Sequence, residues 1–189
     1  MHDLAIYVDL TNRRVITPRL QLTPATIASL EAELRHDHAA LAGLLLATVP
    51  SSWPPDLYDD DARRYSLTKL RESPEHADWW TWYILLPQPG RNPDLVGVGG
   101  FKGPPKAGVV EIGYGVVKDF QCRGYATEAA AGLVRWAQAH SQISMVAAHT
   151  LPELTASIRV LEKNGFVQRG TPEEEGAIRF ELDLPAKPS

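Results

Sequence analysis

A stripe of small residues along one predicted helix constrains the fold of this chain more than any other feature. From Gly124 to His140 the apolar positions recur at the spacing of one helical face, and they are Ala126, Ala129, Ala130, Leu133 and Ala137. Small side chains on that face let the helix lie close to the surface it covers. A strand-like run from Val109 to Val117 ends just before this helix. We therefore predict a strand, a short turn and a helix that packs back against a sheet, as in an α/β domain.

The turn between this strand and this helix has the composition of an anion site. Its sequence is Gln121-Cys122-Arg123-Gly124-Tyr125-Ala126-Thr127. The first N–H groups of a helix lack intrahelical partners, and the helix dipole adds partial positive charge there. Gly124 and Ala126 carry little or no side chain, so a phosphate can approach the main chain, and Arg123 supplies a cation. The turn predicts a cradle for a diphosphate, although an ordinary helix start with an exposed arginine would have the same sequence.

Composition excludes several classes of protein. The 189 residues are 44% hydrophobic and 22% charged, which is ordinary for a globular domain, and the net charge of -4 argues against non-specific nucleic-acid binding. A single cysteine fits a reducing compartment, and no His, Cys or Asp cluster has metal-ligand spacing. With no membrane-length apolar run and no signal-peptide pattern at the N-terminus, we expect a soluble cytoplasmic protein without a membrane partner.

Alternation, prolines and glycines divide the chain into short elements without a repeat or a linker, so we predict one domain over residues 1–189 with a core at about 14–184. The predicted strands are 14–23, 79–86, 95–102, 109–117, 145–151, 166–170 and 178–184. The predicted helices are 24–35, 38–49, 59–72, 124–140 and 152–164. For the first helix we expect Thr23 as the N-cap and Pro24 as the first helical residue. Residues 185–189 are predicted to be a disordered tail.

Two further segments extend the pattern around the anion-site turn. Glu111-Ile112-Gly113-Tyr114 precedes it, and Ala156-Ser157-Ile158-Arg159-Val160-Leu161-Glu162-Lys163-Asn164-Gly165-Phe166 follows it. Together with Gln121-x-x-Gly124-x-Ala126 these segments resemble the GNAT N-acetyltransferases, in particular the branch that acetylates the N-termini of ribosomal proteins. The resemblance implies a single-domain α/β (α+β) fold. Its mixed, mostly antiparallel sheet would have six to seven strands and about four flanking helices, with a splay between the strands at 109–117 and 145–151.

The same resemblance implies acetyl-CoA as the co-substrate, without a metal. The acetyl group would pass directly to a primary amine, either a protein N-terminus or a small molecule, in a monomer or a homodimer. Main-chain groups of the splayed strand would pair with the extended cofactor arm as an added strand would. The residues implied in cofactor binding are Val116, Val117, Gln121, Cys122, Arg123, Gly124, Tyr125, Ala126 and Thr127.

Two residues are candidates for the chemistry. Glu111 is a charged residue on a core strand, and it shares one face of that strand with Gly113 and Gly115, which would leave open space beside its carboxylate. The resemblance implies that Glu111 is the general base, while a salt-bridged structural glutamate remains the alternative. Ser157 is the only polar residue on its helical stripe, where it would donate a hydrogen bond to the departing sulfur or simply allow close packing.

Several residues leave alternatives open. Many relatives have Asn at the position of Leu154 and Tyr at that of Leu161, so a non-catalytic acyl-CoA sensor is the competing hypothesis. His149 is either a base or a structural histidine, and Cys122 is more often incidental than nucleophilic in such a loop. Trp53 and the run Asp59-Asp60-Asp61 would border the acceptor groove in the resembled family, or belong to the core and to a helix cap, respectively.

Overall fold

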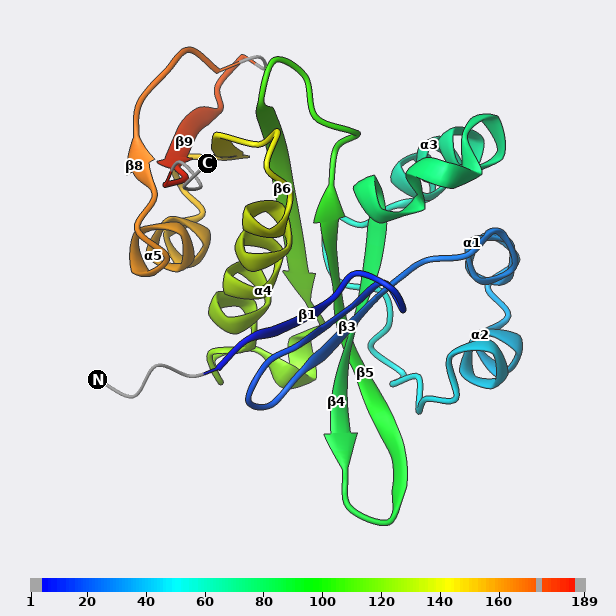
Figure 1. Ribbon diagram of the computed structural model, residues 1–189. Coiled ribbons are helices and arrows are strands. Elements are labelled where there is room, and N and C mark those ends of the chain that lie inside the picture. The colour runs from blue at the N-terminus through cyan, green and yellow to red at the C-terminus, as the bar shows by residue number, and fades with distance from the viewer. Residues whose placement is uncertain (1–4, 173–174, 186–189) are drawn as a thin grey trace.

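The computed structural model describes residues 5–172 and 175–185, and within them nine strands form one mixed sheet in the order β1-β2-β3-β4-β5-β6-β7-β9-β8 (Figure 1). The strands are β1 (Tyr7–Asp9), β2 (Arg14–Ile16), β3 (Gln21–Pro24), β4 (Thr81–Gln88), β5 (Arg91–Phe101), β6 (Val109–Val116), β7 (Met145–Thr150), β8 (Val167–Gln168) and β9 (Ile178–Asp183). Neighbouring strands in this sheet are antiparallel except β6 and β7, which are parallel. The mixed, mostly antiparallel sheet is confirmed, but it has two strands more than the upper limit that we expected. Residues 186–189 of the predicted tail lie outside the described residues.

The two additional strands are at the N-terminus, where sequence reasoning was least accurate. β1 was not predicted, and the single strand expected at 14–23 is a hairpin in which Val15 pairs with Leu22. The break falls at Thr17, whose hydroxyl accepts a hydrogen bond from the Leu20 N–H (2.9 Å), so that these residues form a turn rather than an extended strand.

The first helix also begins later than predicted. Pro24 is the last residue of β3 and lies opposite Trp82 of β4, so the expected cap at Thr23 is wrong. The N-cap is Thr26, whose side chain accepts from the Ser29 N–H (3.1 Å) while the Ser29 hydroxyl accepts from the Thr26 N–H (2.9 Å). This reciprocal pair satisfies two backbone N–H groups at the start of α1. Thr23 and Pro24 cannot cap the helix in this way, because both belong to β3.

Helices cover both faces of the sheet. The described helices are α1 (Ile27–Leu34), α2 (His38–Leu45), α3 (Asp60–Glu72), α4 (Tyr125–Ala139) and α5 (Thr155–Lys163), with 3₁₀ turns at Pro74–Trp79 and Lys118–Phe120. Helices α1 to α3 lie on one side of the sheet, while α4 and α5 lie on the other (Figure 1). Along β4 the side chains of Trp82 and Ile84 join the core under α4, and those of Tyr83 and Leu85 join the core under α1 to α3. The expected double-sided burial of this strand is thereby confirmed.

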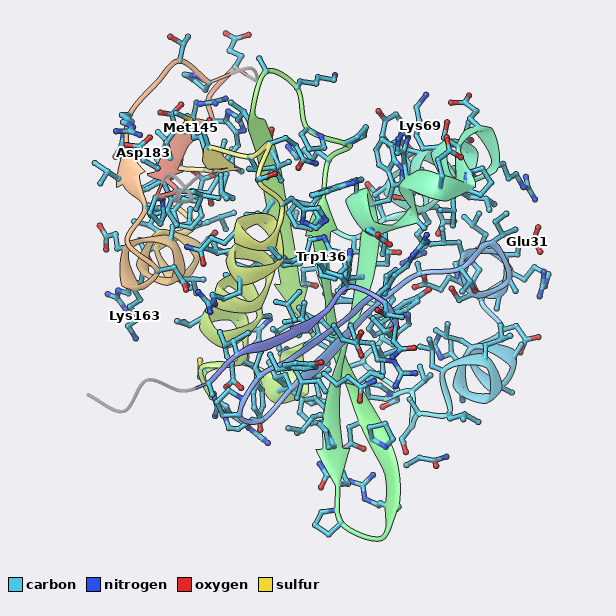
Figure 2. The ribbon with its side chains drawn as sticks, in the orientation of Figure 1. Glu31, Lys69, Trp136, Met145, Lys163 and Asp183 are labelled. Carbon is cyan, nitrogen blue, oxygen red and sulfur yellow. The ribbon has the colours of Figure 1, made fainter. Side chains whose placement is uncertain are left out.

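The small-residue stripe of α4 packs as predicted. Ala129, Ala130, Leu133 and Ala137 are fully buried, and the helix turns Trp136 into the same core, where its ring meets Trp82 edge-on with centroids 4.8 Å apart (Figure 2). Even Gly132 on this helix approaches the sheet so closely that an added Cβ would lie 3.2 Å from Val15. The helix is therefore held rigidly, and its N-terminus has a fixed position at the end of β6.

Candidate functional site

The strands β6 and β7 separate after only three paired positions. Val109, Val110 and Glu111 pair with Met145, Val146 and Ala147, and the two strands then continue without further pairing to Val116 and Thr150, respectively. The remaining length of β6 beyond Glu111 is five residues, or about 17 Å at the usual strand rise. The predicted splay is confirmed, and it leaves an open strand edge that runs from Glu111 to the start of α4.

Alternation along the β5–β6 ladder decides which backbone groups face this gap. The Glu111 carbonyl accepts from β5 and the Val117 N–H donates to β5. Because hydrogen-bonded and non-hydrogen-bonded positions alternate in an antiparallel pair, the even-numbered residues between them direct their N–H and C=O groups away from β5. Those residues are Ile112, Tyr114 and Val116. Val116 is thus better placed than Val117 to pair with an extended ligand.

Side chains of the turn after β6 take part in this arrangement. The Gln121 side chain donates its Nε2–H to the Val116 carbonyl (2.9 Å), and the Val117 carbonyl accepts from the Phe120 N–H (2.9 Å). Cys122 is exposed, carries a free thiol and has a φ of 60°, so it lies in the left-handed region. The Arg123 guanidinium stacks over the Phe120 ring at 5.5 Å. These contacts fix the chain reversal that delivers the helix start to the end of the gap.

The N-terminus of α4 has the free donors that an anion requires. Its N-cap is Gly124, with a φ of 80° and no side-chain cap, and the first intrahelical bond runs from the Glu128 N–H to the Gly124 carbonyl (3.1 Å). The N–H groups of Tyr125, Ala126 and Thr127 therefore have no intrahelical acceptor. Since glycine tolerates the left-handed conformation, Gly124 lets the chain turn sharply into the helix with no Cβ before these donors.

Arg19 supports this turn from a distant part of the chain. Its guanidinium donates to the Arg123 carbonyl (Nη1 to O, 2.9 Å) and to Glu128 (Nε to Oε2, 2.6 Å), and it lies over the Tyr125 ring at 4.8 Å. Glu128 would otherwise add a negative charge to the first helical turn, but Arg19 and the Thr17 hydroxyl hold its carboxylate. The turn thus has cations on both sides. Sequence reasoning missed Arg19 because no local pattern links it to a turn more than a hundred residues away.

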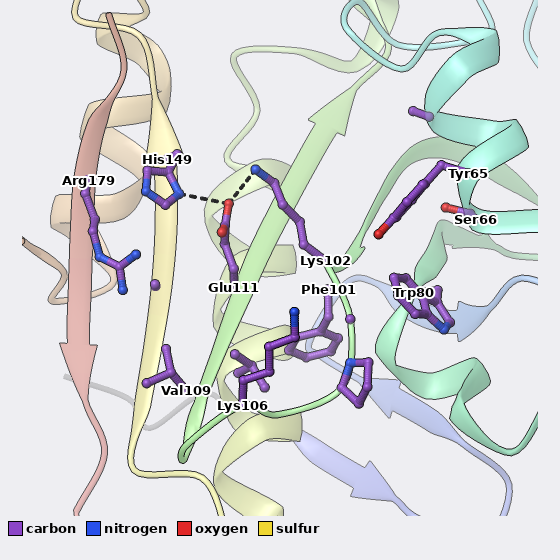
Figure 3. A pocket seen from close by; sticks show the side chains of 15 residues that line it. Tyr65, Ser66, Trp80, Phe101, Lys102, Lys106, Val109, Glu111, His149 and Arg179 are labelled. Atoms are coloured by element: carbon purple, nitrogen blue, oxygen red, sulfur yellow. Dashed lines mark ion pairs between the residues drawn. The ribbon is translucent and has the colours of Figure 1, made fainter. Parts of the chain in front are cut away.

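A cavity of about 730 Å³ opens on the other side of the splay, beneath α3 (Figure 3). The cavity is lined by side chains of α3, of the segment from Phe101 to Lys106, and of β6, β7 and β9. Its polar and aromatic lining residues include Tyr65, Ser66, Trp80, Lys102, Lys106, Glu111, His149 and Arg179. A second cavity of about 280 Å³ shares Ser66, Trp80 and Lys102 with the first and reaches Gly113 and Gly115 of β6. A Cβ added at Gly113 would meet nothing within 4 Å, so the predicted open space is present there, whereas at Gly115 a Cβ would lie 3.2 Å from Pro55.

Glu111 lies in this cavity at the point where the strands part. Its carboxylate oxygen Oε1 is 2.5 Å from Lys102 Nζ and 2.9 Å from His149 Nδ1, as the dashed lines in Figure 3 indicate. Burial alone would raise the pKa of the Glu111 carboxyl, but the hydrogen bonds and charges of Lys102 and His149 outweigh it and hold that pKa below its usual value. Glu111 is therefore an ionised acceptor at neutral pH. Its contacts with Lys102 and His149 match the salt-bridged alternative, and the role of general base stays a prediction.

His149 is almost wholly buried, with 5% of its side chain exposed. Its Nδ1 contacts Glu111, and its Nε2 has no hydrogen-bond partner within the described structure. A buried imidazole that contacts a carboxylate through one nitrogen has its orientation fixed by that contact. The contact between His149 and Glu111 depends on the parallel pairing of β6 with β7, two strands that are far apart in the sequence.

Ser157 approaches the splay from the opposite face, on α5. The Tyr114 hydroxyl donates to the Ser157 carbonyl (3.2 Å) and lies 3.3 Å from the Ser157 hydroxyl. Burial raises the pKa of Tyr114 to about 12, so this phenol keeps its proton across the physiological range. Leu154 is the N-cap of α5 rather than part of it, and Leu161 is buried in the core. Tyr114 thus supplies a protonated hydroxyl on the side of the splay where the usual tyrosine is missing, a role that sequence reasoning did not assign.

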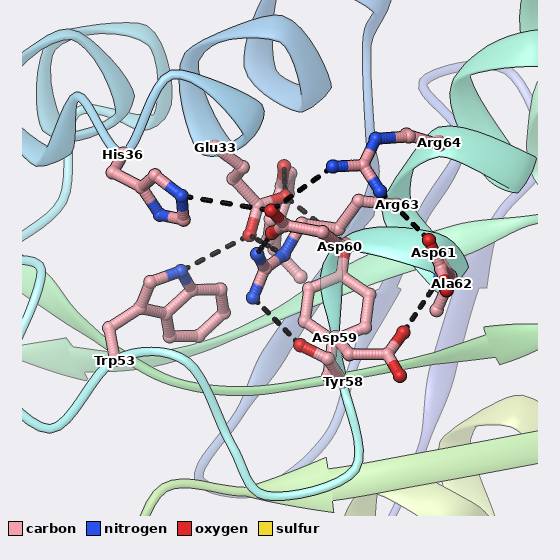
Figure 4. A network of polar contacts seen from close by, with 11 residues as sticks. Glu33, His36, Trp53, Tyr58, Asp59, Asp60, Asp61, Ala62, Arg63 and Arg64 are labelled. Atoms are coloured by element: carbon pink, nitrogen blue, oxygen red, sulfur yellow. Dashed lines mark hydrogen bonds and ion pairs between the residues drawn. The ribbon is translucent and has the colours of Figure 1, made fainter.

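Of the residues considered for the acceptor rim, Trp53 belongs to a buried network, whereas the three aspartates lie at the start of α3 (Figure 4). Glu33 accepts hydrogen bonds from Trp53 Nε1 (3.1 Å), the Tyr58 hydroxyl (3.1 Å) and the Tyr83 hydroxyl (2.7 Å). Burial raises the pKa of the Glu33 carboxyl above its usual value. The three aspartates serve α3: Asp59 caps it, and the other two pair with arginines one turn along. The core and helix-cap alternatives therefore describe Trp53 and the aspartates.

A three-layer fold with a splayed strand pair, a bare helix N-terminus at its open end and a carboxylate at its closed end defines a class of acyl-group transferases. The sequence pattern of the family described as "Acetyltransferase (GNAT) domain" matches residues 19–167. The "Uncharacterized N-acetyltransferase YjdG" of Bacillus subtilis (strain 168) is 31% identical over 153 residues, which are 80% of this chain and 88% of that protein. This chain belongs to the GNAT acetyltransferase family, and it is an N-acetyltransferase that uses acetyl-CoA.

Solved structures agree on the fold. A putative ribosomal-protein-serine acetyltransferase from Vibrio cholerae superposes with a TM-score of 0.61 at 17% identity, over 90% of this chain and 97% of that one. RimL, a ribosomal L7/L12 α-N-protein acetyltransferase in complex with coenzyme A, superposes with a TM-score of 0.60 at 16% identity, over 97% of this chain and 100% of that one.

The described residues contain neither a candidate metal site nor a helix that could span a membrane. No group of three or more His, Cys, Asp or Glu side chains in the described part of the chain is arranged to hold a metal ion. None of the helices between residues 5 and 185, apart from the two undescribed positions, has the length and apolar character needed to cross a bilayer.

Proposed function

We propose that this protein transfers the acetyl group of acetyl-CoA to a primary amine bound in the cavity at Glu111. The observation that carries the proposal is an ionised carboxylate in a cavity of ligand size, located where an open strand edge begins. The acceptor is a protein N-terminus or a small-molecule amine. Reaction in a single ternary complex would gain most from having both reactants fixed on either side of one splay.

On the donor side, the backbone N–H groups of residues 124–127 bind the diphosphate, with Arg123 and Arg19 close by. Three features support this fit: no side chain caps the helix, Gly124 presents no Cβ, and Arg19 holds the nearest carboxylate away. The cofactor arm lies in the gap between β6 and β7, towards which Ile112, Tyr114 and Val116 of β6 direct their backbone groups; of these, the Val116 carbonyl already accepts from Gln121. This arrangement directs the thioester towards Glu111.

On the acceptor side, Glu111 takes a proton from the ammonium group of the bound amine. An amine attacks a thioester only through a free lone pair, so the proton must leave first. An incoming ammonium would take the place that Lys102 Nζ occupies beside Oε1, and displacement of Lys102 would remove one of the two groups that depress the Glu111 pKa. The ammonium is itself a cation and lowers the Glu111 pKa in the same way, so Glu111 would stay ionised and accept the proton of the amine that it holds.

On the opposite face, the hydroxyl groups of Ser157 and Tyr114 interact with the leaving sulfur. Tyr114 stays protonated because of burial, and its hydrogen bond orients Ser157. A thiol with a reference pKa of about 8.5 leaves readily as a thiolate, so one or two hydrogen bonds suffice. The loss of the usual tyrosine at Leu161 is therefore compatible with activity.

The relatives support a choice of amines for the first test. YjdG is described as an N-acetyltransferase, and RimL as an enzyme that acts on the α-amino group of ribosomal L7/L12. A panel should therefore contain peptides that differ in their N-terminal residue, as well as small α-amines and long-chain amines.

Two measurements test the proposal. Calorimetry with acetyl-CoA should detect binding, and a free-thiol assay across the amine panel should detect turnover. A Gly124→Glu, Ala126→Glu double variant should lose at least about tenfold in acetyl-CoA affinity, because two carboxylates would repel the diphosphate. An unchanged affinity in that variant, with a native circular dichroism spectrum, would refute the donor site. Tight binding without turnover on any amine would instead favour a sensor.

A further inference from the structure

Lys102 has the position that an acceptor amine needs. It directly follows β5, its N–H donates to the Glu111 carbonyl (2.9 Å), and its Nζ lies 2.5 Å from Glu111 Oε1 (Figure 3). More than half of the Lys102 side chain is exposed, whereas only 14% of Glu111 is. A fixed carboxylate thus faces an amine on a flexible stem.

We propose that Lys102 is an internal acceptor, so that the protein acetylates its own Lys102 Nζ from bound acetyl-CoA. The inference rests on the proposed function, because it uses the same donor site and the same base. It adds a covalent modification site within the acceptor cavity.

The shared cavity wall explains how Lys102 would reach the thioester. Lys102 lines both cavities, and the smaller of them extends over β5 and β6 to Gly113 and Gly115. The space over Gly113, two residues beyond Glu111 on β6, is empty, whereas Pro55 covers Gly115. A four-carbon stem can therefore carry Nζ from the carboxylate towards the gap between β6 and β7.

The step balances without a further reactant. The Lys102 ammonium gives one proton to Glu111, from which it passes to solvent, and the Nζ lone pair attacks the thioester carbonyl carbon. The new C–N bond forms as the C–S bond breaks, and the electron pair of that bond leaves on sulfur. The second proton lost from nitrogen ends on the thiolate. The products are an acetyl-lysine amide, the coenzyme A thiol and one released proton.

Acetylation would change the site itself. The amide of acetyl-lysine carries no charge, so Glu111 would keep only His149 as a close partner. With one lowering partner gone, the pKa of Glu111 would rise towards its ordinary value. Acetylated protein would then handle external amines with a stronger base.

The cavity contains its own comparison residue. Lys106 lines the same cavity and is exposed, but of these two described lysines only Lys102 is in ion-pair contact with Glu111. Chemical acetylation by free acetyl-CoA would modify both lysines according to their exposure. Enzymatic acetylation would select Lys102 and depend on Glu111.

The test is incubation of the full chain with acetyl-CoA in the absence of any amine, followed by peptide mass mapping over time. Lys102 should gain one acetyl group about a hundredfold faster than Lys106, the low end of general-base catalysis, and Glu111→Gln should remove this difference. The rate per molecule should not change on dilution. Equal rates at Lys102 and Lys106, or an unchanged Lys102 rate in Glu111→Gln, would overturn the inference.

Failure of this inference can be told apart from failure of the proposed function. External amines acetylated at a normal rate while Lys102 stays unmodified would overturn self-acetylation alone. Absence of acetyl-CoA binding would overturn both. In Lys102→Arg, which keeps a cation beside Glu111 but removes the amine, the self-acetylation signal should vanish while acetyl-CoA still binds with the parent affinity.

Discussion

Replacement of Glu111 by glutamine should slow acetylation by an amount that depends on the acceptor. At pH 7 about a tenth of an α-amine with a pKa near 8 is neutral, but only about one part in 2,500 of a lysine-like amine with a pKa of 10.4. Proton removal therefore costs about 1.4 and about 4.6 kcal/mol, respectively. Glutamine fills the same space beside Lys102 and His149 but cannot take the proton. We expect kcat/KM to fall about tenfold for the α-amine, which needs little help, and about a thousandfold for the lysine-like amine, within the range of general-base catalysis.

The assay is kcat/KM from free-thiol release, measured for both amines from pH 7 to pH 9.5. Above its own pKa the α-amine supplies its own lone pair, so the parent and Glu111→Gln should converge there, while the difference for the lysine-like amine persists. Glu72→Gln is a matched control, because Glu72 is exposed at the end of α3, where its carboxylate pairs with Lys69. Equal losses for both amines at every pH would remove Glu111 from the role of base.

Three further changes test the remaining parts. Arg19→Ala removes the cation that neutralises the Glu128 carboxylate beside the helix start, so acetyl-CoA affinity measured by calorimetry should fall severalfold; an unchanged affinity would contradict the role of Arg19. Gly113→Ala should fold with stability equal to the parent or up to about 1 kcal/mol greater, because its Cβ meets nothing, yet raise the KM for the acceptor; an unchanged KM would exclude this floor from the acceptor site. Glu33→Ala leaves three buried ring donors and an arginine without their partner and should cost about 3–5 kcal/mol in urea unfolding. Since burial raises the folded-state pKa of Glu33, its stability contribution is full below the unfolded-state pKa and is lost as pH rises through the folded-state pKa; a slope that persists unchanged in Glu33→Gln would refute this.

The elements that sequence reasoning predicted well are those whose signals are local. The α4 stripe, the bare turn before it and the apolar β4 run each follow from spacing or composition within about fifteen residues. The errors have a different cause. At 14–23 the alternation is correct for both strands of the hairpin, but the turn between them depends on one hydroxyl contact at Thr17. A proline at position 24 is compatible both with the start of a helix and with the last residue of a strand.

For the site, the same distinction separates the donor side from the acceptor side. The turn at residues 121–127 is continuous in sequence, so its chemistry can be read directly. Glu111 can be read as unusual, but its partners cannot be found, because Lys102 comes from the antiparallel neighbour of β6 and His149 from its parallel neighbour. Alternation places Tyr114 on the strand face opposite Glu111, but nothing local indicates that this face meets Ser157. Contacts across strands require the register, which one sequence does not provide.

The donor side is built from one continuous segment and the acceptor side from several, and this difference bears on which amines the protein would accept. The proposed donor site uses mainly backbone groups of one strand and one helix start, with Arg19 as its distant side-chain support. The proposed acceptor cavity is lined by side chains from α3, from the segment after β5, and from β6, β7 and β9, which meet only in the folded state. Because Glu111 sits on the boundary between the two, its basicity depends on which cation lies beside Oε1, whether Lys102, an acceptor ammonium or neither. The identity of that neighbour, rather than any change in the donor site, would then determine which amines are acetylated and at what pH.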